Sequence, residues 1–201
     1  MEYLFYCRNK PNVDDLRMEH REEHWSFMDG YDERFIARGP TLMADRKTAT
    51  GSMHVVDLQS DEEARVFAYD EPYAKAGVFD EIIIRRWTNA LKRTMWEFDG
   101  DDSNPRFLFL GHGREGDDVT DQRNALLESH RAFLAPPEKM KMQIVRGPLW
   151  DLSGDNWVGS FFLLEAPDRA AAEAFFEGEP YTENGLYART ELHDWRFGGR
   201  H

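Results

Sequence analysis

The sequence predicts an α+β protein: two tandem ferredoxin-like β-α-β-β-α-β repeats packed sheet to sheet as an intrachain pseudo-dimeric α+β barrel. Two observations predict this fold: the 201-residue chain repeats itself at a constant offset, and each copy alternates strand-like and helix-like segments in the same order. A sheet covered by helices on one face needs a partner for its other face. A second copy within the same chain supplies that partner.

The repeat is visible in the order of structurally special residues. Arg38-Gly39-Pro40 recurs as Arg146-Gly147-Pro148, at an offset of 147 − 39 = 108. The other pairs at this offset are Gly51-Ser52 and Gly159-Ser160, Ala64 and Ala172, Phe67 and Phe175, Glu71-Pro72-Tyr73 and Glu179-Pro180-Tyr181, Gly77 and Gly185, and Trp87 and Trp195. Without gaps, residues 38–87 and 146–195 share 12 of 50 residues, whereas about 3 are expected from average composition. We therefore expect a first repeat at 1–89, a polar connector at 90–103 and a second repeat at 104–201.

The elements of the first repeat follow from local patterns. Residues 2–8 are apolar and aromatic and predict a strand, and the charge-rich residues 13–33 predict a helix. Residues 35–44 predict a strand interrupted at its Gly-Pro step, and residues 53–58 predict a short β-branched strand.

The second half of the repeat begins with a helix signal. Ser60 suits the N-cap and Glu63 the third helical position, which together form a capping box, and Pro72 is expected to end the regular helix. Residues 79–87 predict the closing strand. The corresponding segments of the second repeat are 106–111, 117–135, 140–152, 157–165, 169–178 and 186–197.

Composition and charge exclude several classes of protein. There are 25 Lys and Arg against 38 Asp and Glu, a formal charge of −13, which argues against binding nucleic acid. No apolar run approaches the length of a signal peptide or membrane span, so we expect no membrane association and a cytoplasmic location. The single cysteine, Cys7, excludes an intrachain disulfide and is expected to be a small buried residue.

Cofactor signatures are also missing from the sequence. It contains no dinucleotide fingerprint, phosphate-binding loop or nucleophile elbow, so no cofactor is expected. His20 and His24 have a metal-compatible spacing, but the second repeat has Leu126 at the position of the first histidine, so no metal is expected either. The expected partner is a small molecule of unknown identity, and the expected state is a monomeric pseudo-dimer or a homodimer of it.

The order of motifs resembles the YCII family. The motifs are a histidine on the first helix, Gly-Pro on the second strand, Gly-Ser opening the third strand and an acidic residue before Pro-Tyr, each present in both copies. The resemblance implies a dimeric α/β barrel related to small cofactor-free monooxygenases and muconolactone isomerases. It also implies a pocket with a His–acid dyad, and for a few members it suggests elimination or dehydrochlorination of hydroxylated aromatics.

Carried onto this sequence, the dyads are His24 with Glu71 and His130 with Glu179. Both copies have Glu where the family usually has Asp. The imidazole would act as general acid and base, with the carboxylate fixing its tautomer. The expected substrate-binding residues are Arg38, Tyr73, Arg146 and Tyr181, because a guanidinium can hold an anionic oxygen through two hydrogen bonds.

Structural interpretations of the same residues stay open. The Gly-Pro steps suit a bend, the Glu-Pro-Tyr motifs suit helix ends, the two arginines suit surface ion pairs, and Trp87 and Trp195 suit packing anchors.

The function also stays open between three classes: a lyase- or isomerase-like enzyme acting on an aromatic or anionic metabolite, a non-catalytic small-molecule binding protein, or an accessory protein. If one copy is active, we expect the first, because it keeps His54 where the second copy has Phe162.

Overall fold

The computed structural model describes residues 1–199, which divide into two compact units. The first unit contains Met1–Trp87 and the chain from Asp194 onward, and the second contains Thr88–His193. Among residues 1–199, none of the helices has the length and the apolar composition of a membrane span.

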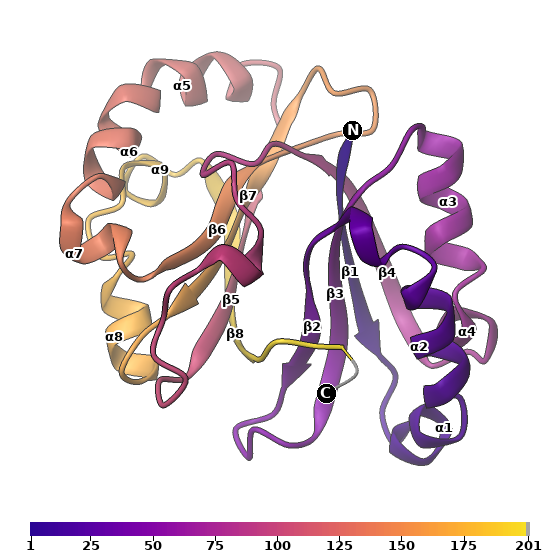
Figure 1. Cartoon of the computed structure of the whole chain (residues 1–201). Helices are drawn as coiled ribbons and strands as arrows, with labels where there is room; N and C mark the ends of the chain where they lie inside the picture. The colour runs from indigo at the N-terminus through magenta and orange to yellow at the C-terminus, as the bar shows by residue number, and fades with distance from the viewer. Residues whose placement is uncertain (200–201) are drawn as a thin grey trace. The chain divides into compact units, whose positions relative to one another are not determined.

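The first unit is a four-stranded antiparallel sheet with its helices on one face (Figure 1). In chain order its elements are β1 (Glu2–Asn9), α1 (Asp14–Glu19), α2 (Arg21–Asp29), η1 (Asp32–Arg34), β2 (Phe35–Leu42), β3 (Ala49–Asp57), α3 (Asp61–Tyr69), α4 (Pro72–Lys75) and β4 (Phe79–Trp87). The strand order is β4-β1-β3-β2. This is the predicted β-α-β-β-α-β order, with each helical stretch divided into shorter helices.

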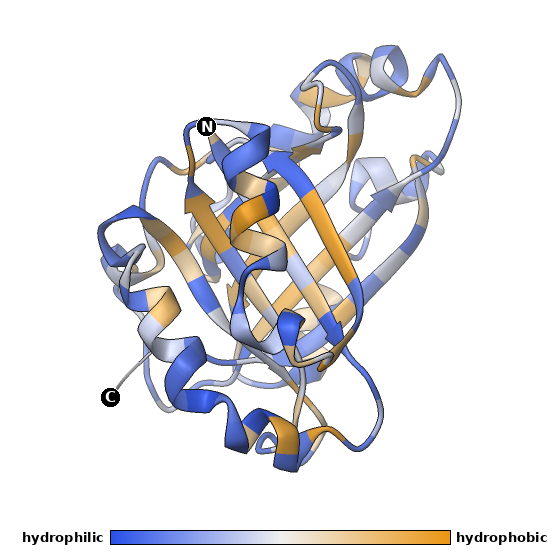
Figure 2. Cartoon of the chain, turned by 90° about the vertical axis from the view of Figure 1, so that its right-hand side faces the viewer, coloured by the Kyte–Doolittle hydropathy of each residue, from blue (hydrophilic) through white to orange (hydrophobic). Residues whose placement is uncertain are grey.

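The helix-facing side of this sheet carries one part of the core. Phe5 on β1 lies opposite His54 on β3 and packs against Phe67 of α3, with ring centroids 4.6 Å apart. Apolar residues are concentrated on the strands and hydrophilic residues on the outer surfaces of the helices (Figure 2). A buried polar residue on the helix-facing side of the sheet, such as His54 on β3, is therefore an exception to this pattern.

The second unit repeats this plan. Its elements are η2 (Met95–Glu97), β5 (Arg106–Gly113), α5 (Val119–Ala125), α6 (Leu127–Leu134), α7 (Pro137–Met140), β6 (Gln143–Trp150), β7 (Trp157–Glu165), α8 (Arg169–Ala174), α9 (Pro180–Glu183) and β8 (Tyr187–Trp195), of which the last two residues belong to the first unit. Strand β7 pairs with both β5 and β6, and β8 is the neighbour of β5. The helices again lie on one face of the sheet (Figure 1).

Each unit also contains the segment that follows the last strand of the other repeat. In the first unit, the amides of Arg196 and Gly198 donate to the carbonyls of Pro40 and Arg38, at 3.4 and 3.0 Å. In the second unit, the amides of Thr88 and Ala90 donate to the carbonyls of Pro148 and Arg146, at 3.2 and 3.0 Å. The two sets of bonds are related by the sequence offset, since 196 − 108 = 88 and 198 − 108 = 90.

Three local expectations are wrong. The strand at 35–44 is not interrupted, because β2 runs through Gly39-Pro40 and its register shifts lie on either side of that step. Pro40 is tolerated because its carbonyl, rather than the amide hydrogen it lacks, bonds to the C-terminal segment. Pro72 begins α4 instead of ending α3, as suits a residue without an N–H at the first helical position. The helix expected at 13–33 is divided at His20.

The helix start predicted at Ser60 is confirmed. The Ser60 hydroxyl accepts a hydrogen bond from the Glu63 amide at 3.1 Å. The Glu63 carboxylate, however, accepts from the amide of Gln59 and from both terminal nitrogens of Arg34. These bonds hold the pKa of Glu63 down at about 2, so the side chain ties α3 to the start of β2.

Candidate functional site

The structure brings each predicted His–Glu pair together. In the first unit, His24 of α2 makes a hydrogen bond through Nδ1 to Oε1 of Glu71. In the second unit, Nδ1 of His130 on α6 lies 2.7 Å from Oε1 of Glu179. All four side chains are buried. Each histidine therefore uses the same ring nitrogen to contact the same kind of partner.

The Glu-Pro-Tyr motif fixes the carboxylate. Glu71 is the N-cap of α4, and its Oε2 accepts a hydrogen bond from the Ala74 amide at 2.9 Å. Glu179 caps α9 in the same way and accepts from the amides of Tyr181 and Thr182 at 3.0 and 2.8 Å. A side-chain oxygen at this position satisfies amides that have no partner within the helix. The motif thus begins a short helix and holds the carboxylate toward the histidine.

The tyrosine of the motif fixes the plane of the imidazole. The rings of His24 and Tyr73 stack with centroids 4.1 Å apart and planes 12° apart. His130 and Tyr181 stack at 4.0 Å and 3°. With Nδ1 bonded to a carboxylate and one ring face covered, Nε2 is the nitrogen available to a ligand.

The pair in the second unit has the charge distribution of a neutral imidazole beside a carboxylate. Burial lowers the pKa of His130, an effect that Glu179 opposes and the arginines Arg146 and Arg123 reinforce. Burial pushes the pKa of Glu179 upward, but hydrogen bonds from His130 and the Tyr181 and Thr182 amides outweigh it and leave that pKa lowered. A neutral His130 donating its Nδ1 hydrogen to an ionised Glu179 follows from both directions.

A cavity of about 580 Å³ in the first unit is lined by His24. Its walls come from α1, α2, β2, the start of β3 and the C-terminal segment, and His54, Ser52 and Tyr73 also line it. Five cationic residues line it, against two carboxylates, Asp14 and Asp29; the cationic residues are Arg17, Arg21, Arg38, Lys47 and Arg196. The lining of this cavity is therefore positively charged, although the chain as a whole has a net charge of −13.

Arg17 is a cavity residue that the sequence interpretation missed. Its guanidinium donates to Oδ1 of Asn9 at 3.0 Å and to Oγ of Ser52 at 3.2 Å, and it lies 4.5 Å from the centre of the Tyr73 ring. Burial lowers its pKa, although Tyr73, Glu71 and other nearby groups oppose this. A signal was present, because Arg17 precedes His24 by seven residues and Arg123 precedes His130 by seven.

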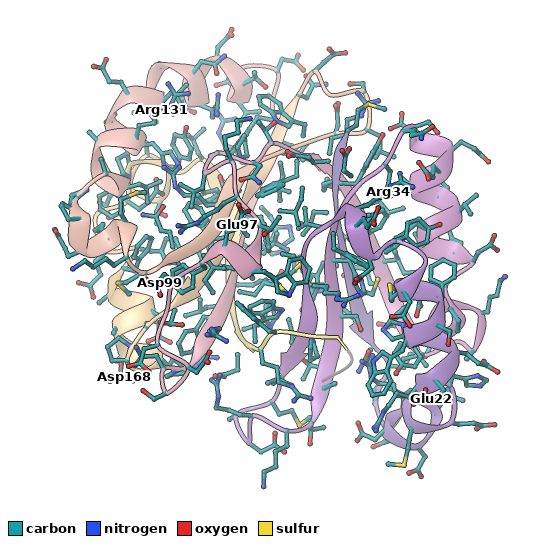
Figure 3. All side chains as sticks on the ribbon, viewed as in Figure 1. Glu22, Arg34, Glu97, Asp99, Arg131 and Asp168 are labelled. Atoms are coloured by element: carbon teal, nitrogen blue, oxygen red, sulfur yellow. The ribbon has the colours of Figure 1, made fainter. Side chains whose placement is uncertain are left out.

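The two predicted strand arginines occupy equivalent positions with different surroundings. Arg38 on β2 is paired in register with His54, and its guanidinium lies 3.1 Å from Asp32. Arg146 on β6 is paired with Phe162, and its buried Nε has no hydrogen-bond partner within the described chain. Burial and the neighbouring Arg131 lower the pKa of Arg146. Arg131 lies on α6 at the helical side of the second unit (Figure 3).

His54 is the polar residue that most clearly separates the two copies. It is buried against the rings of Phe35, Phe67 and His24, with centroids 5.8, 5.8 and 5.9 Å away. Burial lowers its pKa well below the ordinary value, and the nearby His24, Arg38 and Arg17 lower it further. His54 is therefore held as a neutral imidazole on the wall of the cavity.

Replacing His54 by Phe, the residue at the same place in the second repeat, is expected to flatten the acid side of the stability profile. Below pH ~6.5 the unfolded chain takes up a proton at His54 while the folded chain does not, so this residue costs ~1.4 kcal/mol of stability per pH unit. Above that pH the contribution disappears. Urea unfolding at pH 7.5, 6.5 and 5.5 measures it. An H54F profile as steep as that of the wild type would contradict the assignment.

A family model described as the YCII-related domain matches residues 1–88 and 106–196. The chain belongs to the YCII-related domain family. An uncharacterized protein from Haemophilus influenzae is 25% identical over 92 residues, which are 42% of this chain and 94% of that protein. A 5-chloro-2-hydroxyhydroquinone dehydrochlorinase from Burkholderia phenoliruptrix, solved with 2,5-dihydroxybenzoquinone, is 29% identical, covers 45% of this chain and 96% of its own, and has a TM-score of 0.43.

Other solved structures match nearly the whole of this YCII-related chain at low identity. Chlorite dismutase from Candidatus Nitrospira defluvii, in complex with imidazole, is 12% identical with a TM-score of 0.62, and covers 97% of this chain and 91% of its own. An anthrone oxidase-like protein is also 12% identical, with a TM-score of 0.60, and covers 98% and 90%. These matches confirm the predicted fold class, the α+β barrel class built from ferredoxin-like repeats.

Proposed function

We propose that the first unit is a cofactor-independent acid–base catalyst that acts on a small organic molecule as a lyase or isomerase. One observation carries the proposal: His24 lines a cavity while Glu71 holds its Nδ1. A histidine fixed in this way can move a proton at Nε2.

The reaction needs only proton transfer. The lone pair on Nε2 of His24 accepts a proton from a C–H or O–H group of the substrate. The electron pair left behind moves into a neighbouring carbonyl or expels a leaving group, and the imidazolium then returns its proton to another substrate atom or to the leaving group. Glu71 stabilises the imidazolium and keeps its orientation, as the third group of a catalytic triad does. Arg38 and Tyr73 are the proposed substrate contacts.

The second unit has the same dyad, and the proposal treats it as the less active copy. His130, Glu179, Tyr181 and Arg146 repeat the first set, but Phe162 replaces His54 and Leu149 replaces Thr41. Because the Phe162 ring lies 6.4 Å from the His130 ring, the first of these substitutions makes the surroundings of His130 less polar. Catalytic and binding roles for this second set remain predictions.

A binding protein without turnover is the alternative. The binding function is favoured because the His–Glu pair stabilises the local fold in both units. Each glutamate caps a helix, and each histidine stacks on a buried tyrosine. A dyad that holds a fold together does not require chemistry at Nε2.

The two functions are separated by a screen followed by an isotope measurement. Thermal-shift screening of the full chain against small metabolites, without added cofactor, identifies ligands that raise Tm. Each ligand is then incubated with the protein in D2O, and mass spectrometry measures deuterium uptake and product. The proposed function predicts deuterium uptake or product for at least one ligand. A ligand that saturates the protein without either outcome would favour the binding protein.

A further inference from the structure

The C-terminal segment Arg196–Gly199 forms one wall of the cavity in the first unit, and all four residues line it. It packs directly against β2: a Cβ on Gly39 would lie 2.0 Å from the Arg196 carbonyl oxygen, and a Cβ on Gly198 would lie 2.8 Å from Cα of Gly39. Only two residues without side chains allow this approach. The cavity beside His24 is therefore completed by the end of the second repeat.

The same segment contacts the Arg38 side chain. Gly199 has a φ of +131°, and a Cβ there would lie 2.9 Å from a terminal nitrogen of the Arg38 guanidinium. The Gly198 amide also bonds to the Arg38 carbonyl at 3.0 Å. Arg196 and Arg38 are thus brought to one side of the cavity by adjacent backbone segments.

The cationic residues of this cavity differ from most arginines of the first unit. Arg8, Arg34 and Arg86 each pair with a carboxylate at 2.7 to 2.9 Å. Within residues 1–199, four of the five cations lining the cavity form no ion pair with a carboxylate: Arg17, Arg21, Lys47 and Arg196. Five cationic side chains against two carboxylates in the lining leave an excess of positive charge in this cavity. Such an excess in an otherwise acidic protein favours an anionic ligand, because the rest of the molecule repels one.

We propose that this cavity binds the oxyanion group of a small molecule, a carboxylate or a phosphate, and that Arg196 is one of its binding residues. The inference rests on the proposed function for its location, the cavity of His24, but it concerns binding and needs no turnover. Charge-assisted hydrogen bonds from guanidinium groups are the usual means of holding such a group.

The second unit uses the equivalent segment differently. Thr88 stands at the position of Arg196, and its hydroxyl accepts a hydrogen bond from the Trp150 indole at 3.1 Å. Asn89 stands at the position of Phe197; it is buried, donates to the Arg93 carbonyl at 2.8 Å and accepts from the Lys92 amide at 2.9 Å. These two side chains serve the local fold, so we expect the oxyanion site in the first unit alone.

Isothermal titration of the full chain with benzoate, inorganic phosphate and benzamide tests the proposal. Benzoate and benzamide have the same ring and differ in charge, and the comparison of benzoate with phosphate identifies the favoured oxyanion. We expect benzoate or phosphate to bind at one site, benzamide to bind at least about tenfold more weakly, and R196Q to weaken the oxyanion about five- to tenfold. R196K, which keeps the charge, is expected to recover most of the affinity. R65Q, which removes an exposed arginine outside the cavity, is expected to leave it unchanged.

Two results would overturn the oxyanion site: equal affinity of the wild type for benzamide and benzoate, or equal losses in R196Q and R65Q. The proposed function fails separately, because a protein that binds benzoate through Arg196 but never turns over a ligand retains the oxyanion site. Titration of H24Q separates the two further, since it is expected to bind the oxyanion while losing proton transfer.

Discussion

Replacing His24 by Gln is expected to lower kcat about 10²- to 10⁴-fold, the range associated with loss of one general acid–base group. His24 lines the cavity, and its Nδ1 is already held by Glu71, so Nε2 is the atom that this substitution removes from the reaction. A glutamine amide can still donate to the Glu71 carboxylate, which keeps the N-cap of α4 in place. Steady-state kinetics on a ligand found by the thermal-shift screen measures the change.

The matched control is H130Q. His130 has the same carboxylate partner and the same stacked tyrosine, so the two substitutions make similar local changes to the fold. We expect H130Q to keep kcat within about twofold of the wild type. This change is much smaller than the loss expected for H24Q, so the kinetics distinguish the two variants. Equal losses in the two variants would show that both copies work. Wild-type turnover in H24Q would remove His24 from the mechanism.

Replacing Gly39 by Ala is expected to destabilise the protein by ~3 kcal/mol, at the upper end of overpacking substitutions. The added methyl would lie 2.0 Å from the carbonyl oxygen of Arg196 and 2.9 Å from the ring of Trp195. Relief requires the C-terminal segment to move off β2, so oxyanion affinity falls together with stability. Urea unfolding measures the first effect and benzoate titration the second.

Gly30 provides the control for this substitution. It lies at the end of α2 with a φ of −64°, and a Cβ there would meet only the Phe27 carbonyl oxygen, at 3.2 Å. G30A is expected to change the free energy of unfolding by less than ~1 kcal/mol and to leave benzoate binding intact. A G39A protein as stable as G30A, with unchanged benzoate affinity, would mean that the segment does not pack on β2 as described.

Much of the fold was predictable because the repeated residues have backbone roles that few other residues can fill. Glu-Pro-Tyr recurs because a helix begins there, and the two Gly-Pro steps recur on the second strand of each repeat. The exchange of segments between repeats was not predictable. Pairing of Gly198 with Arg38 joins residues far apart in the chain, and no local pattern encodes such a contact.

The candidate site was predictable in part. The His–Glu pairs followed from the family resemblance, and their geometry agrees with it, although their catalytic role stays a prediction. Arg17 was detectable from its repeated spacing to the histidine. Arg196 was not, because its counterpart Thr88 has a different chemistry and the repeat gives no signal at that position.

The state of the His24 ring tests the central claim most directly and needs no substrate. Nitrogen-15 NMR of the histidine side chains at pH 7.5 identifies which ring nitrogen carries hydrogen, with His130 as an internal reference for a ring bonded through Nδ1 to a glutamate. The account predicts that His24 carries its hydrogen on Nδ1, that Nε2 has a free lone pair, and that benzoate shifts the Nε2 signal of His24 but leaves His130 unchanged. A hydrogen on Nε2, with Nδ1 bare toward Glu71, would contradict it.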